Sequence, residues 1–140
     1  MIITLVKKES GFDFIKKMEE QYNSIEELEK LFERTNNMKF YVDLENWNYY
    51  KDNPTDTIEY SESLVSNEIK LSQLDLSILN VIKYEKPKSI RELALLLDKD
   101  VSNIQPRIHK LKDMGYIQLK NGNKNNKIPY LNYDLIKVEI

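Results

Sequence analysis

The chain has 140 residues, with 21 Lys and Arg, 23 Asp and Glu, and no cysteine. This length suits one domain, or two small domains that share a core. The lack of thiols excludes disulfides, thiolate metal sites and thiol catalysis. The first ten residues hold too short an apolar stretch for a signal peptide, and no run reaches membrane-spanning length. We therefore expect a soluble cytoplasmic protein with no membrane contact.

The formal net charge of −2 hides an uneven distribution. Residues 1–70 hold 9 Lys and Arg against 15 Asp and Glu, and residues 71–140 hold 12 against 8. The two halves therefore carry −6 and +4, an asymmetry that favours a nucleic-acid face on the second half and a different task for the first. An acidic half that only keeps the protein soluble remains an alternative.

The first half begins with a strand pattern and continues with a helical one. A β-branched run predicts a strand over 2–8, and apolar steps of three and four residues predict helix over 12–34. Ser24 and Glu27 stand at capping-box spacing, which favours a break near Asn23, although an unbroken helix would keep the same apolar face.

The following segment alternates apolar and polar residues. Phe40, Val42 and Leu44 predict a strand over 38–44 that could pair with the first strand. A loop at 52–56 and a short strand near 58–60 are expected next, because this stretch combines aromatic residues with Asn, Asp and Pro. The class predicted for residues 1–70 is an acidic α+β region that serves dimerisation or partner binding.

Residues 71–140 contain three capped helix patterns followed by strands. An apolar stripe from Leu74 to Ile82 follows Ser72, and Ser89 with Glu92 has capping-box spacing before a short helix that ends by Leu97. A second stripe is then formed by Val101, Ile104, Ile108 and Leu111.

Gly115 is expected to end this helix in a left-handed cap. Strands over 116–120 and 127–131 around a polar turn predict a β-hairpin, and 133–140 predicts a last strand that pairs with an N-terminal strand or with another chain. The whole pattern predicts an α+β fold in which a winged helix-turn-helix follows the N-terminal strand-helix-strand region.

The face of the last helix opposite its apolar stripe carries short polar and cationic side chains. Such residues read base edges and phosphates when a helix enters the major groove of DNA. The predicted contacts on this helix are Ser102, Asn103, Gln105, Arg107, His109 and Lys110. Ser102, Asn103 and Gln105 are the candidates for base readout, and Arg107 and Lys110 for phosphates. A solvated helix face with no function has the same composition, and DNA contact is indicated only by this face together with the surrounding helices and hairpin.

The predicted hairpin supplies a second basic group. Lys120, Lys124 and Lys127 stand among Asn and Gly with no acid nearby, which suits a backbone or minor-groove contact. A flexible polar turn with incidental lysines is the alternative.

Pro106 interrupts the expected recognition helix. An interior proline removes one hydrogen bond and crowds the preceding turn, at a cost of about 3 kcal/mol. Either the helix starts late, near Ser102 or Asn103, or it bends. His109 is the chain's single histidine and, without a spaced partner, makes no ordinary transition-metal site.

No catalytic motif is found, so an enzyme is not expected and no cofactor is predicted. The carboxylate pairs Asp43 with Glu45 and Asp56 with Glu59 are interpreted as solvated acids. The chain has only three glycines and no glycine-rich phosphate loop. The aromatic cluster of Trp47, Tyr49 and Tyr50 is expected to attach the first half to the winged unit or to a second subunit.

The motifs of the second half resemble those of the winged helix-turn-helix regulators of the MarR/ArsR-like group in prokaryotes. The resemblance rests on Ser89 to Ala94, Lys99 and Asp100, Leu111 with Gly115 to Ile117, Ile128 to Tyr130, and Tyr133 to Ile140. It covers about half of the chain and implies transcriptional control, in some members as an antitoxin-like or autoregulatory protein. Such proteins more often have basic or small polar residues at the positions of Gln105 and Pro106.

Two functional hypotheses follow. The first is a sequence-specific regulator that binds double-stranded DNA as a homodimer formed through residues 1–70, with residues 71–140 as the DNA-binding domain. The second is a protein-interaction module whose acidic half binds and neutralises a basic partner such as a toxin, with the winged unit as scaffold.

Overall fold

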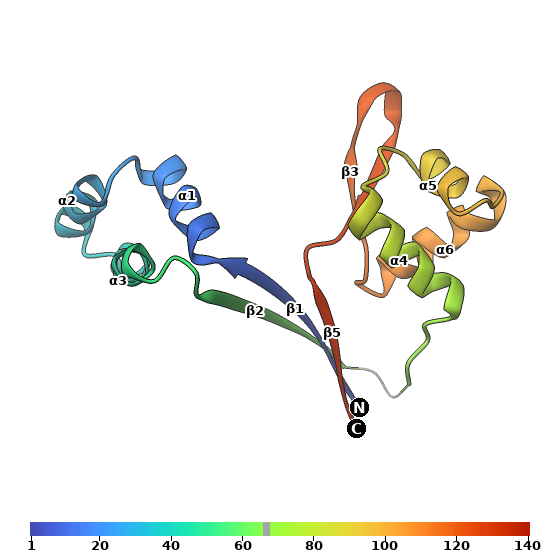
Figure 1. Ribbon diagram of the computed structural model, residues 1–140, viewed down its shortest axis with the longest axis horizontal. Helices are drawn as coiled ribbons and strands as arrows, with labels where there is room; N and C mark the ends of the chain where they lie inside the picture. Colours follow the sequence, from blue (N-terminus) through green and yellow to red (C-terminus); the bar gives the residue numbers. More distant parts are fainter. Residues whose placement is uncertain (66–67) are drawn as a thin grey trace. The chain divides into compact units, whose positions relative to one another are not determined.

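The computed structural model describes residues 1–65 and 68–140 and has an α+β fold. Six α-helices and five strands are formed within these residues (Figure 1). In chain order they are β1 (Ile2–Ser10), α1 (Gly11–Tyr22), α2 (Ile25–Thr35), α3 (Met38–Asp52), β2 (Thr57–Val65), α4 (Gln73–Glu85), α5 (Ile90–Leu96), α6 (Val101–Asp113), β3 (Gln118–Asn121), β4 (Lys127–Tyr130) and β5 (Leu135–Glu139).

The contacts divide the chain into two compact units. Unit 1 comprises Met1–Val6 and Ser61–Ile140, and unit 2 comprises Lys7–Tyr60. The division therefore does not fall at residue 70, where the charge pattern placed it, because Met1–Val6 and the chain from Ser61 onward belong to one unit. The two strands β1 and β2 each have residues in both units.

Unit 2 is a cluster of three helices with its own small core. Phe14, Met18, Leu28 and Trp47 are buried in it. The Ser24 hydroxyl accepts a hydrogen bond from the Glu27 backbone N–H, so the predicted break between α1 and α2 is confirmed. Asn23 ends α1, with its backbone N–H donating to the Glu19 carbonyl, and the Ser24 hydroxyl begins α2, so both helices keep their apolar faces on the shared core.

The strand predicted over 38–44 is wrong, because this segment is the first half of α3. Phe40, Leu44 and Trp47 step by four and three residues and face the core of unit 2, which is the spacing of a helix. Val42 alternates with them but is 51% exposed. The apparent alternation arises because α3 has apolar side chains on its outer face as well.

The aromatic cluster expected at an interface is divided between core and surface. Trp47 is 4% exposed and belongs to the core of unit 2 itself. The ring of Tyr50 lies 5.3 Å from that of Phe14. Tyr49 is 51% exposed and its hydroxyl donates to the Asp56 carboxylate. The expectation that all three residues attach unit 2 to another surface is therefore wrong for Trp47.

Unit 1 has the larger core, built by α4, α5 and α6 against β1. Its fully buried side chains include Ile78, Leu93, Ile104, Ile108 and Leu111. All of these except Leu93 lie on an apolar stripe that the sequence predicted, and Leu93 belongs to the predicted short helix between the two stripes. The caps expected at Ser72 and Ser89 are also present, the first as a full capping box with Asp75.

Gly115 ends α6 in the predicted left-handed conformation, with φ 89°. The Tyr116 N–H donates to the Leu111 carbonyl at 2.8 Å, and the Gly115 N–H donates to the Lys112 carbonyl at 3.0 Å. This pair of bonds is a Schellman motif, which satisfies the last carbonyls of the helix and turns the chain directly into β3.

Two sheets complete the fold. One has the strand order β2-β1-β5, with β5 antiparallel to β1 and Ile3 opposite Val138 (Figure 1). The last predicted strand thus pairs with the N-terminal one. The other sheet is the predicted hairpin, in which β3 and β4 pair antiparallel with Gln118 opposite Tyr130.

Candidate functional site

The polar face of α6 is exposed, and its apolar face is fully buried. Ile104, Ile108 and Leu111 are each 0% exposed. The opposite side carries five exposed polar side chains, all predicted from the sequence, namely Ser102, Asn103, Gln105, His109 and Lys110. None of these five side chains forms a hydrogen bond or ion pair with the residues that the structure describes. Their donors and acceptors are therefore available to a ligand.

Pro106 lies within this exposed face, in the interior of α6. The helix begins at Val101, so the alternative of a late start is wrong. Proline has no N–H to donate to the carbonyl four residues earlier, which here is that of Ser102. The helix therefore presents an apolar ring and a carbonyl without its usual helical donor beside the polar side chains.

Arg107 does not share the exposed face. Its Nη2 donates to the Ser72 hydroxyl at 2.8 Å, and its Nε lies 3.5 Å from the Asp75 carboxylate. Both partners belong to the capping box that starts α4. The guanidinium thus holds α6 to α4, and it is not on the surface where a phosphate contact was predicted.

The spacing within α6 contained a signal for this contact that the sequence analysis missed. Residue 107 lies three positions after Ile104 and four before Leu111, which is the spacing of the buried stripe itself. A cation at such a position requires an anionic partner on the neighbouring helix. From the sequence, Ser72 was interpreted only as the cap of the helix that follows it, and the partner of residue 107 was not predicted.

The hairpin holds the three predicted lysines in exposed positions. Lys120 places its ammonium 5.4 Å from the centre of the Tyr130 ring, and the Lys127 ammonium donates to the Asn121 side chain. Lys124 lies in the turn with φ 54° and makes no hydrogen bond or ion pair with the described residues. The Tyr130 ring thus orients Lys120 and the Asn121 amide orients Lys127. Lys124 is positioned by the turn alone.

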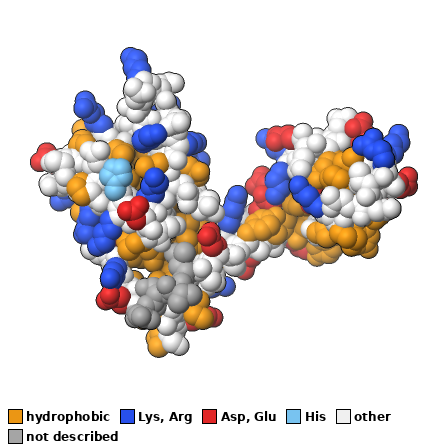
Figure 2. Space-filling model, turned by 180° about the vertical axis from the view of Figure 1, so that it is seen from behind, with side chains coloured by type: hydrophobic (Ala, Val, Ile, Leu, Met, Phe, Trp, Pro, Cys, Tyr) orange, Lys and Arg blue, Asp and Glu red, His pale blue; other side chains and the backbone are white. Residues whose placement is uncertain are grey.

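The exposed side of α6 and the hairpin lie on one face of unit 1. Figure 2 shows the pale blue side chain of the single histidine, His109, with blue Lys and Arg side chains near it and over the hairpin above. We call this face the α6–hairpin surface. It comprises Ser102, Asn103, Gln105, His109, Lys110, Lys120, Lys124 and Lys127.

The charges of the two units differ in sign. Unit 1 has 13 Lys and Arg against 10 Asp and Glu, a net +3, and unit 2 has 8 against 13, a net −5. One acidic feature lies beside the α6–hairpin surface. A shallow groove at the turn before α6 is lined by Leu95, Asp98, Lys99, Asp100 and Asn103. An anion that approaches the start of α6 therefore meets two carboxylates.

One carboxylate of each pair considered in the sequence, Asp43 and Asp56, accepts a hydrogen bond from a tyrosine. Asp43 accepts from the Tyr22 hydroxyl at 2.6 Å, and burial together with this bond raises the pKa of Tyr22 to about 12. Asp56 accepts from the Tyr49 hydroxyl. Among residues 1–65 and 68–140 no group of three or more His, Cys, Asp or Glu could hold a metal ion. No helix in that part of the chain combines the length and apolarity needed to cross a bilayer.

This geometry defines an α+β protein whose unit 1 presents a polar helix face and a basic hairpin. Residues 70–138 match the model of a protein family described as HVO_A0114. The matched range runs from just before α4 into β5, so it covers the whole α6–hairpin surface and none of α1, α2 or α3. No curated protein and no solved structure matched the chain.

Proposed function

We propose that this protein binds double-stranded DNA through the α6–hairpin surface and acts as a sequence-specific transcriptional regulator. In this proposal unit 1 is a winged helix-turn-helix of the MarR/ArsR-like kind. The helices α5 and α6 form the helix-turn-helix, α6 enters the major groove, and the β3–β4 hairpin is the wing.

The observation that carries the proposal is the unpartnered polar face of α6. Five exposed side chains with free donors and acceptors line one side of a helix whose other side is 0% exposed at Ile104, Ile108 and Leu111. A major groove admits one helix, and it is read by short polar side chains near the helix N-terminal half. Ser102, Asn103 and Gln105 have that position.

Different roles follow for the residues of the surface. Gln105 can make a bidentate pair with adenine, whereas Lys110 is a point charge suited to a phosphate. The wing lysines suit phosphates or the minor groove, because no carboxylate lies on β3, β4 or the turn between them. Arg107 has no part in recognition because its guanidinium is bound to Ser72 and Asp75.

The test is a selection of bound sequences from random duplexes, followed by fluorescence anisotropy on the recovered duplex across a range of salt concentrations. We expect the logarithm of affinity to fall linearly with the logarithm of salt concentration, with a slope of about −0.9 for each phosphate neutralised. Lys110→Ala should weaken all duplexes alike and reduce the slope by about one. Gln105→Ala should cost about 1–3 kcal/mol on the selected sequence and less on others.

Lys51→Ala is the matched control, because Lys51 is an exposed lysine in the last turn of α3, in unit 2. It should leave affinity and slope unchanged. Binding that is independent of salt, or equal effects of Lys51→Ala and Lys110→Ala, would exclude the proposed surface. Absence of DNA binding at low salt, together with one stoichiometric protein partner, would instead favour the protein-interaction hypothesis.

A further inference from the structure

The strand β5 forms one edge of the three-stranded sheet. Within the described residues β1 pairs with one side of β5 and no strand pairs with the other. Along that outer side alternate residues direct their backbone N–H and C=O groups away from the sheet. A free edge of this kind is a template for another strand.

The sequence at this edge is self-complementary. Residues 136–140 read Ile-Lys-Val-Glu-Ile, which is symmetric about Val138 except that a cation and an anion exchange places. If two copies pair antiparallel with Val138 opposite Val138, Lys137 of each copy lies opposite Glu139 of the other. Ile136 then lies opposite Ile140, so every cross-strand pair is either of opposite charge or apolar.

Neighbouring registers lose this match. Centring the pair on residue 137 sets lysine opposite lysine, and centring it on residue 139 sets glutamate opposite glutamate. Like charges directly opposite each other destabilise a pair of strands. A lysine in an edge strand ordinarily prevents pairing, and here the glutamate two residues later removes that obstacle.

The apolar side chains at the end of β5 are exposed, as expected of a strand that a partner covers. Ile3 and Leu5 on β1 are 2% and 4% exposed, and they lie opposite Val138 and Ile136 in the register. Residues that lie opposite each other share one face of the sheet. On this apolar face Val138 is nevertheless 41% exposed, and Ile140 beyond it is fully exposed. The buried surface of unit 1 thus continues onto apolar side chains that the chain leaves uncovered.

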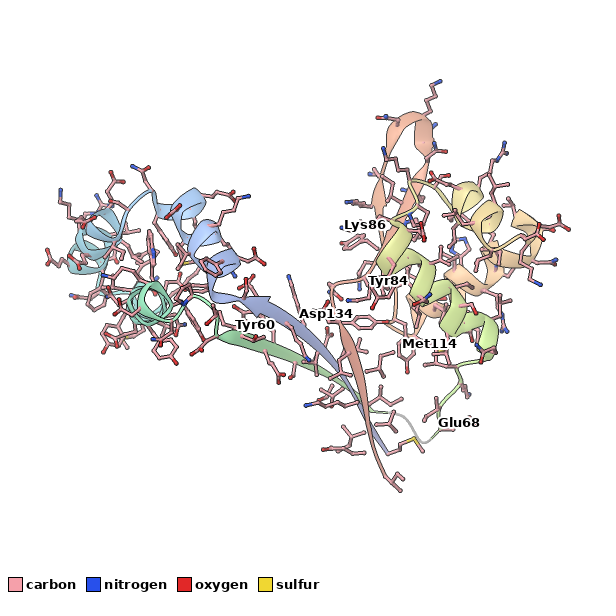
Figure 3. The ribbon with its side chains drawn as sticks, viewed as in Figure 1. Tyr60, Glu68, Tyr84, Lys86, Met114 and Asp134 are labelled. Atoms are coloured by element: carbon pink, nitrogen blue, oxygen red, sulfur yellow. The ribbon has the colours of Figure 1, made fainter. Side chains whose placement is uncertain are left out.

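The strand is anchored at its beginning. The Asp134 backbone N–H donates to the Val6 carbonyl at 2.7 Å, and the Asp134 carboxylate accepts from Lys83 of α4. Figure 3 labels Asp134 at the start of β5. Because these contacts fix the strand on β1, its outer edge is presented to a partner without prior ordering, which lowers the entropic cost of association.

The other edge strand does not offer the same match. Residues 57–65 include Glu59 and Glu62 and no Lys or Arg. Two copies that paired through β2 would bring carboxylates together with no cation on either strand. The occupant that the chemistry of the sheet favours is therefore a second β5.

We propose that two copies of this chain associate through β5, in the register that sets Val138 opposite Val138, and so form a continuous six-stranded sheet of order β2-β1-β5-β5-β1-β2. The dimer contact expected within residues 1–70 is thereby placed at residues 136–140. This assembly does not depend on DNA binding, and either proposal can fail without the other.

The experiment measures the mass of the full-length protein by sedimentation equilibrium between 1 and 100 µM, a range that covers typical homodimers of moderate affinity. The wild type is expected to dimerise. Lys137→Glu and Glu139→Lys should each raise the dissociation constant about tenfold or more, because each places two like-charge pairs in the dimer. The double variant Lys137→Glu/Glu139→Lys restores opposite charges and should dimerise like the wild type.

Two controls locate the contact. Lys88→Glu makes the same charge change on an exposed residue outside the sheet and should leave the dimer intact. Met38→Lys/Val42→Lys disrupts the exposed apolar face of α3 and should also leave it intact. The proposal is overturned if the wild type is monomeric or if the double variant stays monomeric. It is also overturned if either single variant remains dimeric, or if the α3 variant dissociates the dimer. Far-ultraviolet circular dichroism checks that all variants are folded.

Discussion

Arg107 on α6 lies with its Nε 3.5 Å from the Oδ1 of Asp75 on α4. The Asp75 side chain is almost fully buried, and this Oδ1 has no hydrogen bond within the described residues. The other carboxylate oxygen accepts the Ser72 backbone N–H at 2.9 Å. The guanidinium is thus the cation that accompanies a buried carboxylate, and it ties α6 to the beginning of α4.

We therefore expect Arg107→Ala to destabilise unit 1 by about 1–3 kcal/mol, because it leaves the Asp75 charge buried without its neighbouring cation. The guanidinium is itself partly exposed, which places the loss below that of a fully buried pair. Urea unfolding followed by far-ultraviolet circular dichroism measures the change. Lys110→Ala removes an exposed cation from the same helix and should change the free energy of unfolding by no more than about 0.5 kcal/mol. Equal stability of the two variants would contradict the role of Arg107.

Gly115 leads to a second prediction, about the end of α6. Its φ of 89° lies in the left-handed region, where a Cβ is strained. Gly115→Ala should cost about 1 kcal/mol of stability, and Gly115→Asn less, because asparagine tolerates this region better. Thermal or urea unfolding of the three proteins gives the order directly. If alanine were as stable as glycine, the Schellman geometry between α6 and β3 would not hold in solution.

Local signals predicted unit 1 well because its helices begin and end at residues that strongly prefer helix-capping positions. Ser72, Ser89 and Gly115 each fix a helix end through a backbone hydrogen bond or a positive φ, and the predicted hairpin follows. Whether the exposed face of α6 binds DNA stays a prediction, because exposure shows only that its side chains are available.

Unit 2 was harder to predict because α3 has apolar residues on both faces. Phe40 and Leu44 face the core, while Met38 and Val42 are exposed, and the mixture resembles the alternation of a strand. Arg107 was misplaced for a related reason. A cationic side chain such as that of Arg107 turns toward the core only when a neighbouring helix supplies an anion. Here the anion is Asp75, which is 32 residues earlier in the chain.

The partly buried Tyr22 leads to a third prediction, about alkaline pH. Burial and the bond to Asp43 raise the pKa of Tyr22 from 10.0 to about 12. Between these values the folded protein keeps a proton that the unfolded chain releases, so stability is complete below pH 10 and falls as pH rises toward 12. Tyr22→Phe should be less stable near neutral pH and show a shallower loss across this range.

Urea unfolding at pH 9 to 12, followed by Trp47 fluorescence, measures this effect. Trp47 is the chain's single tryptophan and lies in the core of unit 2, as Tyr22 does, so its emission reports the unit concerned. Tyr41→Phe, at an exposed tyrosine on α3, is the control and should keep the wild-type slope. An identical slope for Tyr22→Phe and the wild type would refute the linkage.

The carboxylates before α6 lead to the last prediction, which rests on DNA binding at the α6–hairpin surface. Asp98 and Asp100 are exposed in the turn that precedes the helix, and Asp100 is the N-cap residue but makes no side-chain capping bond. Negative charge at this end favours the helix dipole and opposes an approaching phosphate. Asp100→Asn should therefore lower stability by up to about 0.5 kcal/mol while it raises affinity for duplex DNA about two- to fivefold.

The opposite signs of the two effects make the experiment specific. Anisotropy at low salt measures the affinity, and urea unfolding of the same samples measures the stability. Glu85→Gln, which neutralises an exposed acid at the end of α4, should change neither by a comparable amount. If Asp100→Asn binds DNA no better than Glu85→Gln does, phosphates do not approach the N-terminal end of α6. The duplex would then have to lie against the hairpin or the later turns of the helix, where Lys110 and Lys124 carry the exposed charge.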